Sequence, residues 1–415
     1  ALPEPMMDME MLAGLKRTVV LRLACLAVAA FFTTGLPARD PIELGDVVGS
    51  SGIRTRTVQV IGEPLSLVNQ AVRLVDLHGG LERSGSNADF TFRLAASGAA
   101  GVELEIRSGG QSLWSQTFVR ASQRESLLEA ADAVVRRTLG IPGFFQSQLV
   151  FVSDRTGHSE IYLSDILFQA VRQLTRDRSQ CLSPVLSPDG NVVLYTSYHA
   201  TGFPDIYRID LRSGKRTTFA GFKGTNSGAT FSPDGNWVAM ILSGSGNSEV
   251  YVGNAQGRQL RRLTRSASLE ADPAWSPDGR RLVLTSDQMG GPQIFTMDLQ
   301  GRSLTRVRTD ISRNCSEPVW NPRDEDQIAF TAAMAGEFEV ALYRFSENRS
   351  TVLTRGAGDA VHPHWLADGR HLIYTERTSR YRRLMLLDTV TGNQTRLSPA
   401  ELNNAEQAAA TYPGS

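Results

Sequence analysis

The chain has 415 residues, which is enough for two or three domains. Its 43 basic and 43 acidic side chains give a formal net charge of zero, so the composition offers no excess positive charge for nucleic acid. The 37 glycines are typical of a β protein that is rich in turns.

Residues 1–38 predict an N-terminal extension and a signal peptide. A basic pair at residues 16–17 precedes the mostly apolar run 18–32, and small residues follow at 35–38. A basic start, an apolar centre and a small-residue cleavage site are the features of a secretory signal. The alternative is a membrane anchor, which is disfavoured because the run is short for crossing a bilayer. We therefore expect an exported protein with no stable membrane insertion after cleavage.

Residues 39–143 predict a small α/β domain. A first helix is expected from four apolar residues at helical spacing, namely Leu65, Val68, Val72 and Val75. Three strands follow, at residues 90–94, 102–107 and 113–118. A second helix is expected between Ser122, which forms a capping-box pattern with Glu125, and Gly140.

A repeated phrase dominates the rest of the chain. Ser-Pro-Asp-Gly begins at Ser187, Ser232 and Ser276, and degenerate copies occupy residues 321–324 and 366–369. Successive copies are 45, 44, 45 and 45 residues apart. Each unit contains four short apolar segments separated by turn residues, and this period with four strands per unit is typical of propeller blades.

The number of blades follows from counting two segments of the repeat. Third-strand segments occur six times, at residues 160–162, 205–207, 249–251, 293–295, 339–341 and 383–385. Complete first strands occur five times, so the blade that begins at Leu149 lacks one. We expect residues 408–413 to supply it by pairing with residues 149–153, because closing the ring removes an open sheet edge. The predicted fold is mainly β, with a six-bladed β-propeller at residues 144–415 after the α/β domain.

Two cysteines remain once Cys25 is removed with the signal. Cys181 and Cys315 each lie six residues before a repeat phrase, three blades apart in a ring of six. A disulfide needs Cα atoms within about 7 Å. We therefore expect no bond between them.

The chain resembles the TolB family, the exported propeller proteins of the Tol–Pal system in Gram-negative envelopes. The resemblance covers roughly residues 85–415, and it is carried by the junction 130–143, the strand 149–154 and the Tyr-Pro pair at 412–413. It implies a monomeric periplasmic scaffold that is not an enzyme and has no cofactor. Such proteins bind the lipoprotein Pal at one mouth of the channel and support outer-membrane integrity and cell division. Their N-terminal segment contacts the inner-membrane protein TolA, although the N-terminal domain here is shortened before Ala88.

Loops that precede the first strands converge on one mouth of the predicted propeller. By resemblance, residues 225–228 and 269–272 lie where two blades of the family contact Pal. The predicted partner-binding residues are Thr225, Asn226, Ser227, Gly228, Glu270, Ala271, Asp272, Asn314, Ser316, Glu317 and His362. The alternative is that they are solvated loop residues, because most contacts at an interface rim contribute little.

His362 and His364 flank a proline on the same rim and suggest a second possibility. Histidines with nearby carboxylates can hold a metal, as in a propeller lyase or hydrolase, but two histidines lack the ligand number of a committed site. We therefore predict no metal. A third possibility is a paralogue that binds another protein or a glycan. The sequence contains neither a Gly-x-Ser-x-Gly motif nor a Gly-rich phosphate loop with Lys, so no catalytic residue is predicted.

Overall fold

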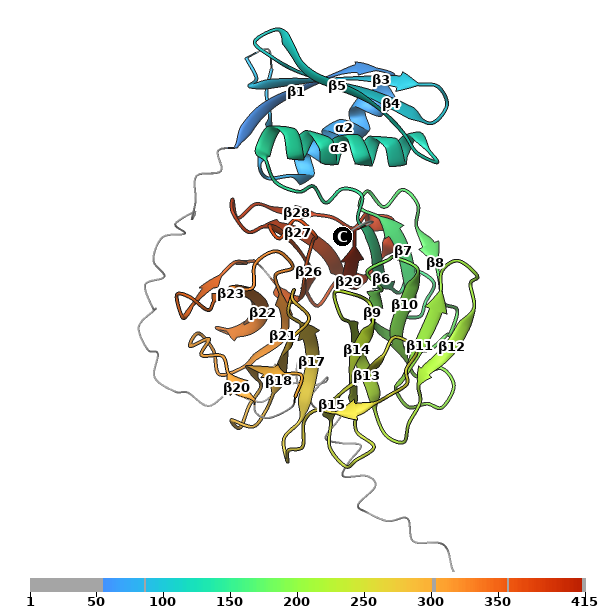
Figure 1. Cartoon of the computed structure of the whole chain (residues 1–415), viewed down its shortest axis with the longest axis vertical. Helices are drawn as coiled ribbons and strands as arrows, with labels where there is room; N and C mark the ends of the chain where they lie inside the picture. The colour runs from blue at the N-terminus through green and yellow to red at the C-terminus, as the bar shows by residue number, and fades with distance from the viewer. Residues whose placement is uncertain (1–54, 86, 301–303, 357, 413–415) are drawn as a thin grey trace, which may run out of the picture.

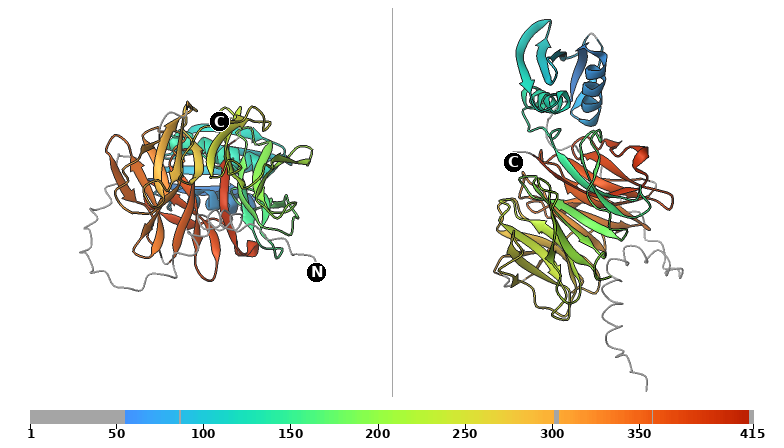
Figure 2. Two further views of the ribbon diagram at one scale, coloured as in Figure 1. Left: turned by 90° about the horizontal axis from the view of Figure 1, so that it is seen from below. Right: turned by 90° about the vertical axis from the view of Figure 1, so that its right-hand side faces the viewer.

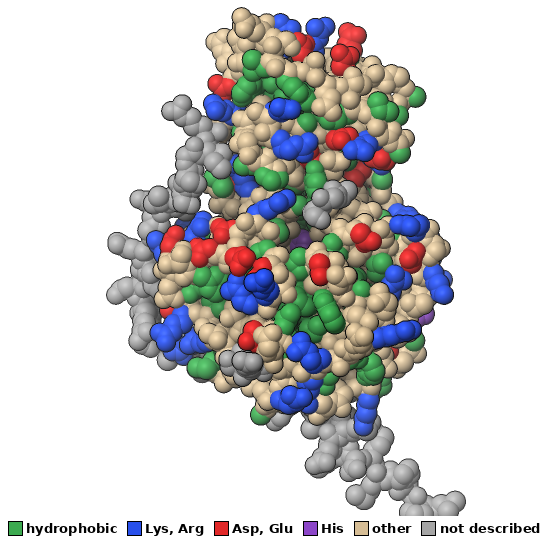
Figure 3. Space-filling view, in the orientation of Figure 1, with side chains coloured by type: hydrophobic (Ala, Val, Ile, Leu, Met, Phe, Trp, Pro, Cys, Tyr) green, Lys and Arg blue, Asp and Glu red, His purple; other side chains and the backbone are tan. Residues whose placement is uncertain are grey.

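The computed structural model describes residues 55–85, 87–300, 304–356 and 358–412, which form an α/β unit stacked on one end of a β-propeller (Figures 1 and 2). The signal peptide predicted at residues 1–38 and Pro413 lie outside these residues. No helix in the described part of the chain is long and apolar enough to cross a membrane. Acidic and basic side chains are interspersed on the side of the molecule that Figure 3 shows.

The α/β unit contains one five-stranded sheet in the order β2-β1-β3-β4-β5. β1 runs parallel to β2 and β3, whereas β3, β4 and β5 are antiparallel and correspond to the three predicted strands. The elements are β1 (Arg56–Glu63), α2 (Leu65–Leu77), β2 (Leu81–Arg83), β3 (Phe90–Ser97), β4 (Gly101–Ser108), β5 (Gln111–Val119) and α3 (Gln123–Leu139). α3 lies between the sheet and the propeller (Figure 1).

The predicted apolar stripe of the first helix was correct at Val68 and Val75, which are buried, but not at Leu65. Leu65 is 71% exposed, and the buried side chains of α2 are Leu67, Val68, Ala71, Leu74 and Val75. The helix carries more apolar residues than one face needs, so the face that meets the sheet is decided by tertiary packing.

The second helix was predicted correctly at both ends. The Oγ of Ser122 accepts a hydrogen bond from the backbone N–H of Glu125 at 3.2 Å. The helix ends at Gly140, whose φ of 72° lies in the left-handed region that favours glycine.

The propeller consists of six four-stranded sheets in the described residues, with the first strand of each blade innermost. Blade I contains β29 (Ala405–Thr411), β6 (Gln148–Ser153), β7 (Glu160–Asp165) and β8 (Arg172–Gln173). Blades II and III contain β9 (Cys181–Leu186), β10 (Val192–Ser197), β11 (Asp205–Asp210), β12 (Arg216–Ala220), β13 (Asn226–Phe231), β14 (Trp237–Leu242), β15 (Glu249–Asn254) and β16 (Arg261–Arg262). Blades IV and V contain β17 (Glu270–Trp275), β18 (Arg281–Ser286), β19 (Gln293–Asp298), β20 (Thr305–Arg306), β21 (Cys315–Trp320), β22 (Gln327–Met334), β23 (Glu337–Arg344) and β24 (Arg349–Val352). Blade VI contains β25 (Asp359–Trp365), β26 (His371–Arg377), β27 (Arg382–Asp388) and β28 (Gln394–Arg396), and a short 3-10 helix, η2 (Ala400–Leu402), precedes β29.

The last described strand closes the ring, as the repeat count predicted. β29 pairs antiparallel with β6, so that Ala405 lies opposite Ser153 and Ala410 opposite Leu149. The hydroxyl of Ser153 also donates to the backbone carbonyl of Leu402 at 2.7 Å. Blade I is therefore built from two segments that lie about 250 residues apart in the sequence.

Apolar residues between successive blades form separate clusters around the ring. The cluster between blades VI and I differs, because it continues through the linker residues Phe144 and Phe145 into the α/β unit. The two cysteines are free and fully buried at the starts of β9 and β21, three blades apart. The α/β unit thus shares a core with the seam at which the ring closes.

Candidate functional site at the mouth of the propeller channel

A channel of about 620 Å³ runs through the propeller, lined by the first strands of all six blades. One of its two ends, here called the mouth face, carries two sets of connections. Those that lead into first strands are residues 174–180, 221–225, 263–269, 307–314, 353–356 and 397–404. Those between second and third strands are residues 154–159, 198–204, 243–248, 287–292, 335–336 and 378–381. The opposite end, the junction face, carries the repeat-phrase turns and the turns between third and fourth strands, and it meets the α/β unit.

Six equivalent residues form a ring around the channel just inside the mouth face. This ring, here called the collar, consists of Ser183, Gly228, Asp272, Glu317, His362 and Gln407. Each has a φ between 49° and 62° and lies where the pairing of first and second strands shifts register. A bulge of this kind interrupts the ladder and redirects one side chain. Because only one collar residue is glycine, five side chains are presented at the channel.

Hydrogen bonds link collar residues of neighbouring blades. The Oε2 of Glu317 accepts from the backbone N–H of His362 at 2.7 Å, and the Oε1 of Gln407 accepts from the N–H of Ser183 at 2.7 Å. The Nδ1 of His362 lies 2.8 Å from the Oε1 of Glu317. With the contact of 3.5 Å between the Nε2 atoms of Gln407 and His362, these bonds join four of the six collar residues and brace blades V, VI, I and II against one another.

The collar contains a carboxylate and an imidazole, each of which favours the charged form of the other. Burial by itself raises the pKa of Glu317, but the charge of His362 and its hydrogen bonds outweigh this effect and lower the pKa to about 2. Burial lowers the pKa of His362, but the charge of Glu317 outweighs it and raises the pKa. The pairing therefore favours the carboxylate form of Glu317 and the protonated ring of His362.

The predicted partner-binding residues separate into three groups. Gly228, Asp272, Glu317 and His362 belong to the collar and line the channel. Thr225, Ala271 and Asn314 are half-buried on the mouth face. Four side chains are buried within or between blades and offer little surface to a partner: Asn226, Ser227, Glu270 and Ser316. Their burial follows from pairing with the second strand just before the bulge, a feature that the repeat spacing does not reveal.

Buried Asn226 instead holds two loops of the mouth face in place. Its Nδ2 donates to the backbone carbonyl of Phe222 at 2.8 Å and to the Oδ1 of Asp205 at 3.0 Å. Its Oδ1 accepts from the N–H of Phe222 at 3.0 Å, and its own N–H donates to the carbonyl of Pro204 at 2.8 Å. The exposed rings of Phe203 and Phe222 lie on the two loops that this side chain joins.

Glu270 faces a second buried carboxyl group. No other side chain or backbone group donates to its Oε2 or to that of Glu249, and the two carboxyl groups can share a hydrogen bond when one of them is protonated. Burial and the charge of Glu249 raise the pKa of Glu270 to about 7. The other five blade boundaries place a different residue at this position: Cys181, Asn226, Cys315, Ala360 and Ala405. Among these six equivalent first-strand positions, Glu270 is the one that carries a carboxyl group.

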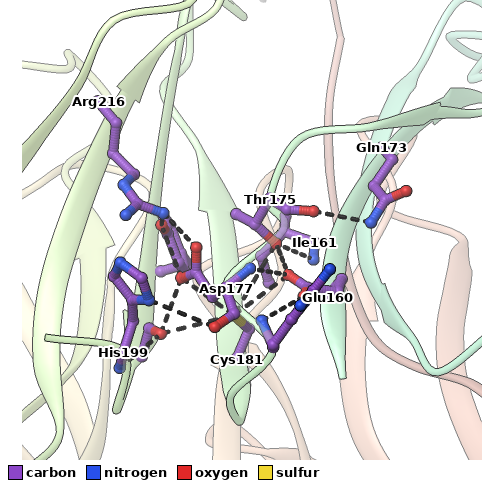
Figure 4. A network of polar contacts seen from close by, with 11 residues as sticks. Glu160, Ile161, Gln173, Thr175, Asp177, Cys181, His199 and Arg216 are labelled. Carbon is purple, nitrogen blue, oxygen red and sulfur yellow. Dashed lines mark hydrogen bonds and ion pairs between the residues drawn. The ribbon is translucent and has the colours of Figure 1, made fainter. Parts of the chain in front are cut away.

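A polar network at the boundary of blades I and II supports the neighbouring part of the mouth (Figure 4). The carboxylate of Glu160 accepts from the hydroxyl of Thr175 at 2.5 Å and from the N–H of Asp177 at 3.0 Å. The carboxylate of Asp177 pairs with Arg216. Cys181 lies within the network, and burial raises the pKa of its thiol to about 12, so the thiol stays protonated at neutral pH.

The two rim histidines do not form a metal site in the described residues. The Nε2 of His364 accepts from the backbone N–H of Ala410 at 2.9 Å, so it faces β29. The one described group of three potential ligands is elsewhere, at the junction, and consists of His78, Asp368 and His371.

The junction group has the chemistry of an ion-pair network. Gly80 donates its N–H to the Nδ1 of His78 at 3.1 Å, so the proton of the neutral ring is on Nε2 and no lone pair faces the group. Burial lowers the pKa of His78 to about 3. Burial also lowers the pKa of His371, but the charge of Asp368 outweighs it and raises the pKa to about 9. His371 is thus a buried cation that two aspartates neutralise.

Two collar residues, Ser183 and Gln407, were missed from the sequence. A signal for them existed, because every collar residue lies five positions before the second residue of a repeat phrase or, for Gln407, before Tyr412. The missing rule was that the first strand bulges at this position.

Comparisons with known proteins agree with this architecture. A family model described as the TolB beta propeller domain matches residues 135–412. The chain is 35% identical over 144 residues to "Tol-Pal system protein TolB" of Desulfosudis oleivorans, covering 35% of this chain and 32% of that protein. It is 32% identical over 172 residues to "Protein TolB homolog" of Chlorobaculum tepidum, covering 41% of this chain and 39% of that protein. The aligned part thus spans about a third of the length of these relatives.

A solved structure supports the same fold over a longer range. TolB from Acinetobacter baumannii superposes with a TM-score of 0.77 at 22% identity, covering 86% of this chain and 97% of that one. At this identity the likeness speaks for the fold alone. The family model, however, covers well over half of the sequence. The chain therefore belongs to the TolB β-propeller domain family.

Proposed function

We propose that this protein is a non-enzymatic scaffold of the Tol–Pal envelope system, and that it binds a Pal-like lipoprotein at the mouth face. The proposal rests on the collar, which presents Asp272, Glu317 and His362 at an end of the channel that the α/β unit does not occupy. The names of its relatives as Tol–Pal system proteins support this assignment.

The proposal includes a location and a cellular role. The protein acts in the periplasm after cleavage of a signal peptide in residues 1–38, and it supports outer-membrane integrity and cell division. A segment N-terminal to the α/β unit contacts TolA. The α/β unit at residues 39–143 and the propeller at 144–415 are proposed as the two domains.

A binding experiment tests the lipoprotein contact. Isothermal titration calorimetry of the full chain against the soluble domain of the Pal-like lipoprotein from the same organism is expected to show one-to-one binding. Removing two collar carboxylates, with Asp272→Ala and Glu317→Ala together, is expected to weaken binding at least tenfold, because it removes the polar contacts that these side chains offer. The matched control is Asp234→Ala with Asp278→Ala on the junction face. Equal affinities for both double variants would refute the mouth face as the docking surface.

The alternatives predict different outcomes. A propeller hydrolase or lyase with a metal at His362 and His364 predicts stoichiometric metal in the purified protein, which elemental analysis would detect. A paralogue for another protein or a glycan predicts an intact fold and no affinity for the Pal-like domain.

A further inference from the structure

The two ends of the propeller differ in charge, although the whole chain is neutral. The mouth-face connections carry nine exposed basic side chains, here called the basic rim: Arg155, Arg176, Arg178, Lys223, Arg265, Arg308, Arg313, Arg355 and Arg380. The same connections carry two exposed acidic side chains, Asp310 and Glu401.

The turns of the junction face allow the charge at the two ends of the same propeller to be compared. Their described residues carry five exposed basic side chains, Arg212, Lys215, Arg258, Arg280 and Arg323. They also carry five exposed acidic side chains, Asp189, Asp234, Asp278, Glu325 and Glu347. The excess of positive charge therefore belongs to one end of the propeller.

The charges of the basic rim are free to act on a partner. In the described residues, none of the nine forms an ion pair within the chain. Three of them, Arg176, Arg265 and Arg355, follow the same Leu-Thr pair in different blades. Repetition at one position distributes the charge around the mouth, and such a ring of one sign attracts a partner of the opposite sign over about a Debye length.

Exposed apolar side chains accompany this charge. Phe203 and Phe222 are 47% and 48% exposed, and Met289 is 59% exposed. All three lie in mouth-face connections, and buried Asn226 bonds to the backbone of Phe222 and to that of Pro204, the residue after Phe203. Exposed aromatic side chains on a hydrogen-bonded backbone, within a charged surround, are typical anchors of protein interfaces.

We infer that the mouth face recognises a folded protein with an acidic surface, which the basic rim steers and which Phe203 and Phe222 anchor. This inference rests on the proposed docking function and adds the chemistry of the partner to it. A folded protein is favoured over an anionic polymer because the exposed rings of Phe203 and Phe222 need an apolar pocket opposite them, and a lipid surface is an outcome that the test distinguishes.

The test uses two matched triple variants of the full chain. The mouth variant is Arg176→Glu, Arg265→Glu and Arg355→Glu, and the junction-face control is Arg212→Glu, Lys215→Glu and Arg258→Glu. Association and dissociation rates with the soluble Pal-like domain are measured between 20 and 500 mM NaCl. We expect the mouth variant to lower the association rate about tenfold or more at low salt, whereas the control stays within about twofold of the unchanged chain. Phe222→Ser should mainly accelerate dissociation.

Two further probes separate this inference from the proposed function. If the Pal-like domain binds but both triple variants behave alike, the docking function stands and the acidic-partner inference falls. If that domain does not bind, soluble polyglutamate is the probe. It should bind the unchanged chain and the control at low salt but not the mouth variant, and equal binding to both variants overturns the inference. Stronger retention on phosphatidylglycerol vesicles through the same arginines would also overturn it, because the partner would then be a membrane.

Discussion

At the junction face His371 is fully buried between Asp368 and Asp388, whereas at the mouth face His362 keeps 30% of its side chain exposed beside Glu317. Both histidines belong to blade VI. The carboxylates beside His371 lie on the same blade, whereas Glu317 lies on blade V. At the junction the charges are matched inside the protein, with Arg370 also paired to Asp388 at 2.6 Å. At the mouth, solvent reaches the pair.

The difference shows that the junction network serves the stability of the fold, whereas the collar pair is accessible to a second molecule. Each buried charge needs a partner of opposite sign, because a buried charge without one strongly destabilises the folded state. The junction meets this requirement and joins the α/β unit to the seam between blades VI and I. The collar leaves part of its charge accessible, which is the condition for recognising a second molecule.

The largest expected effect comes from removing the strand that spans both ends. Deleting all residues after Leu402 removes β29, and with it the ladder to β6, the collar residue Gln407 and the junction residue Tyr412. Counting about 1 kcal/mol for each of five or more lost hydrogen bonds, we expect a fall in melting temperature of about 10 °C or more. Calorimetry of the truncated chain checks this, and an unchanged melting temperature would contradict the closure.

A junction variant is expected to cost somewhat less. The buried carboxylate of Asp132 on α3 accepts from the backbone N–H groups of Phe145 and Gln146 at 2.7 and 3.1 Å, and from the hydroxyl of Tyr412 at 2.8 Å. Asp132→Ala leaves two backbone donors without an acceptor, which should lower the free energy of unfolding by about 3–5 kcal/mol. Tyr412→Phe removes one bond and should cost about 1 kcal/mol. Urea unfolding of both variants measures the ratio, and equal losses would argue against this role for Asp132.

On the mouth side, Glu270→Gln should stabilise the protein in a pH-dependent manner. The pKa of Glu270 is raised to about 7 in the folded state, above its usual 4.5. The folded state therefore binds more protons between these values, and stability is lost as the pH rises from 4.5 through 7. The variant should gain up to about 3 kcal/mol over the unchanged chain at pH 8 and little at pH 4.5.

Urea unfolding at both pH values tests this gain, with exposed Glu401→Gln as the control. A gain of the same size at pH 4.5 and pH 8 would show that the effect does not come from the raised pKa.

The smallest effect on stability is expected at the collar itself. His362→Gln removes the partly exposed charge beside Glu317, and such pairs contribute about 1 kcal/mol or less. The same substitution should weaken binding of the Pal-like domain more than it changes the melting temperature. Thermal melting and calorimetric titration of the same variant compare the two effects. A large loss of stability would show that the collar pair, like the junction network, serves mainly to stabilise the fold.

Much of the fold was predictable because it follows from a period. The 45-residue spacing gave six blades and located the closing strand, and both were confirmed. The site was less accessible because side chains just before the collar bulge turn inward, as Asn226 and Glu270 do. Spacing identifies equivalent positions, but whether a position faces the channel or a neighbouring blade depends on the bulge.

The basic rim shows a second limit. Its residues are visible in the sequence, and the Leu-Thr-Arg triplets at 174–176, 263–265 and 353–355 repeat. The net charge of zero conceals them, because acidic residues balance them at other places in the chain. The imbalance emerges only when each connection is assigned to one end of the propeller.

Strand β29 also determines when the molecule can be completed during synthesis. Blades II to VI are continuous in sequence and each can form from its own four strands, whereas β6 waits for a partner about 250 residues downstream. Until residue 411 has left the ribosome, the edge of β6 and the apolar cluster beneath the α/β unit remain open. We therefore expect a nascent chain of this protein to depend on protection at its early strands until translation is nearly finished.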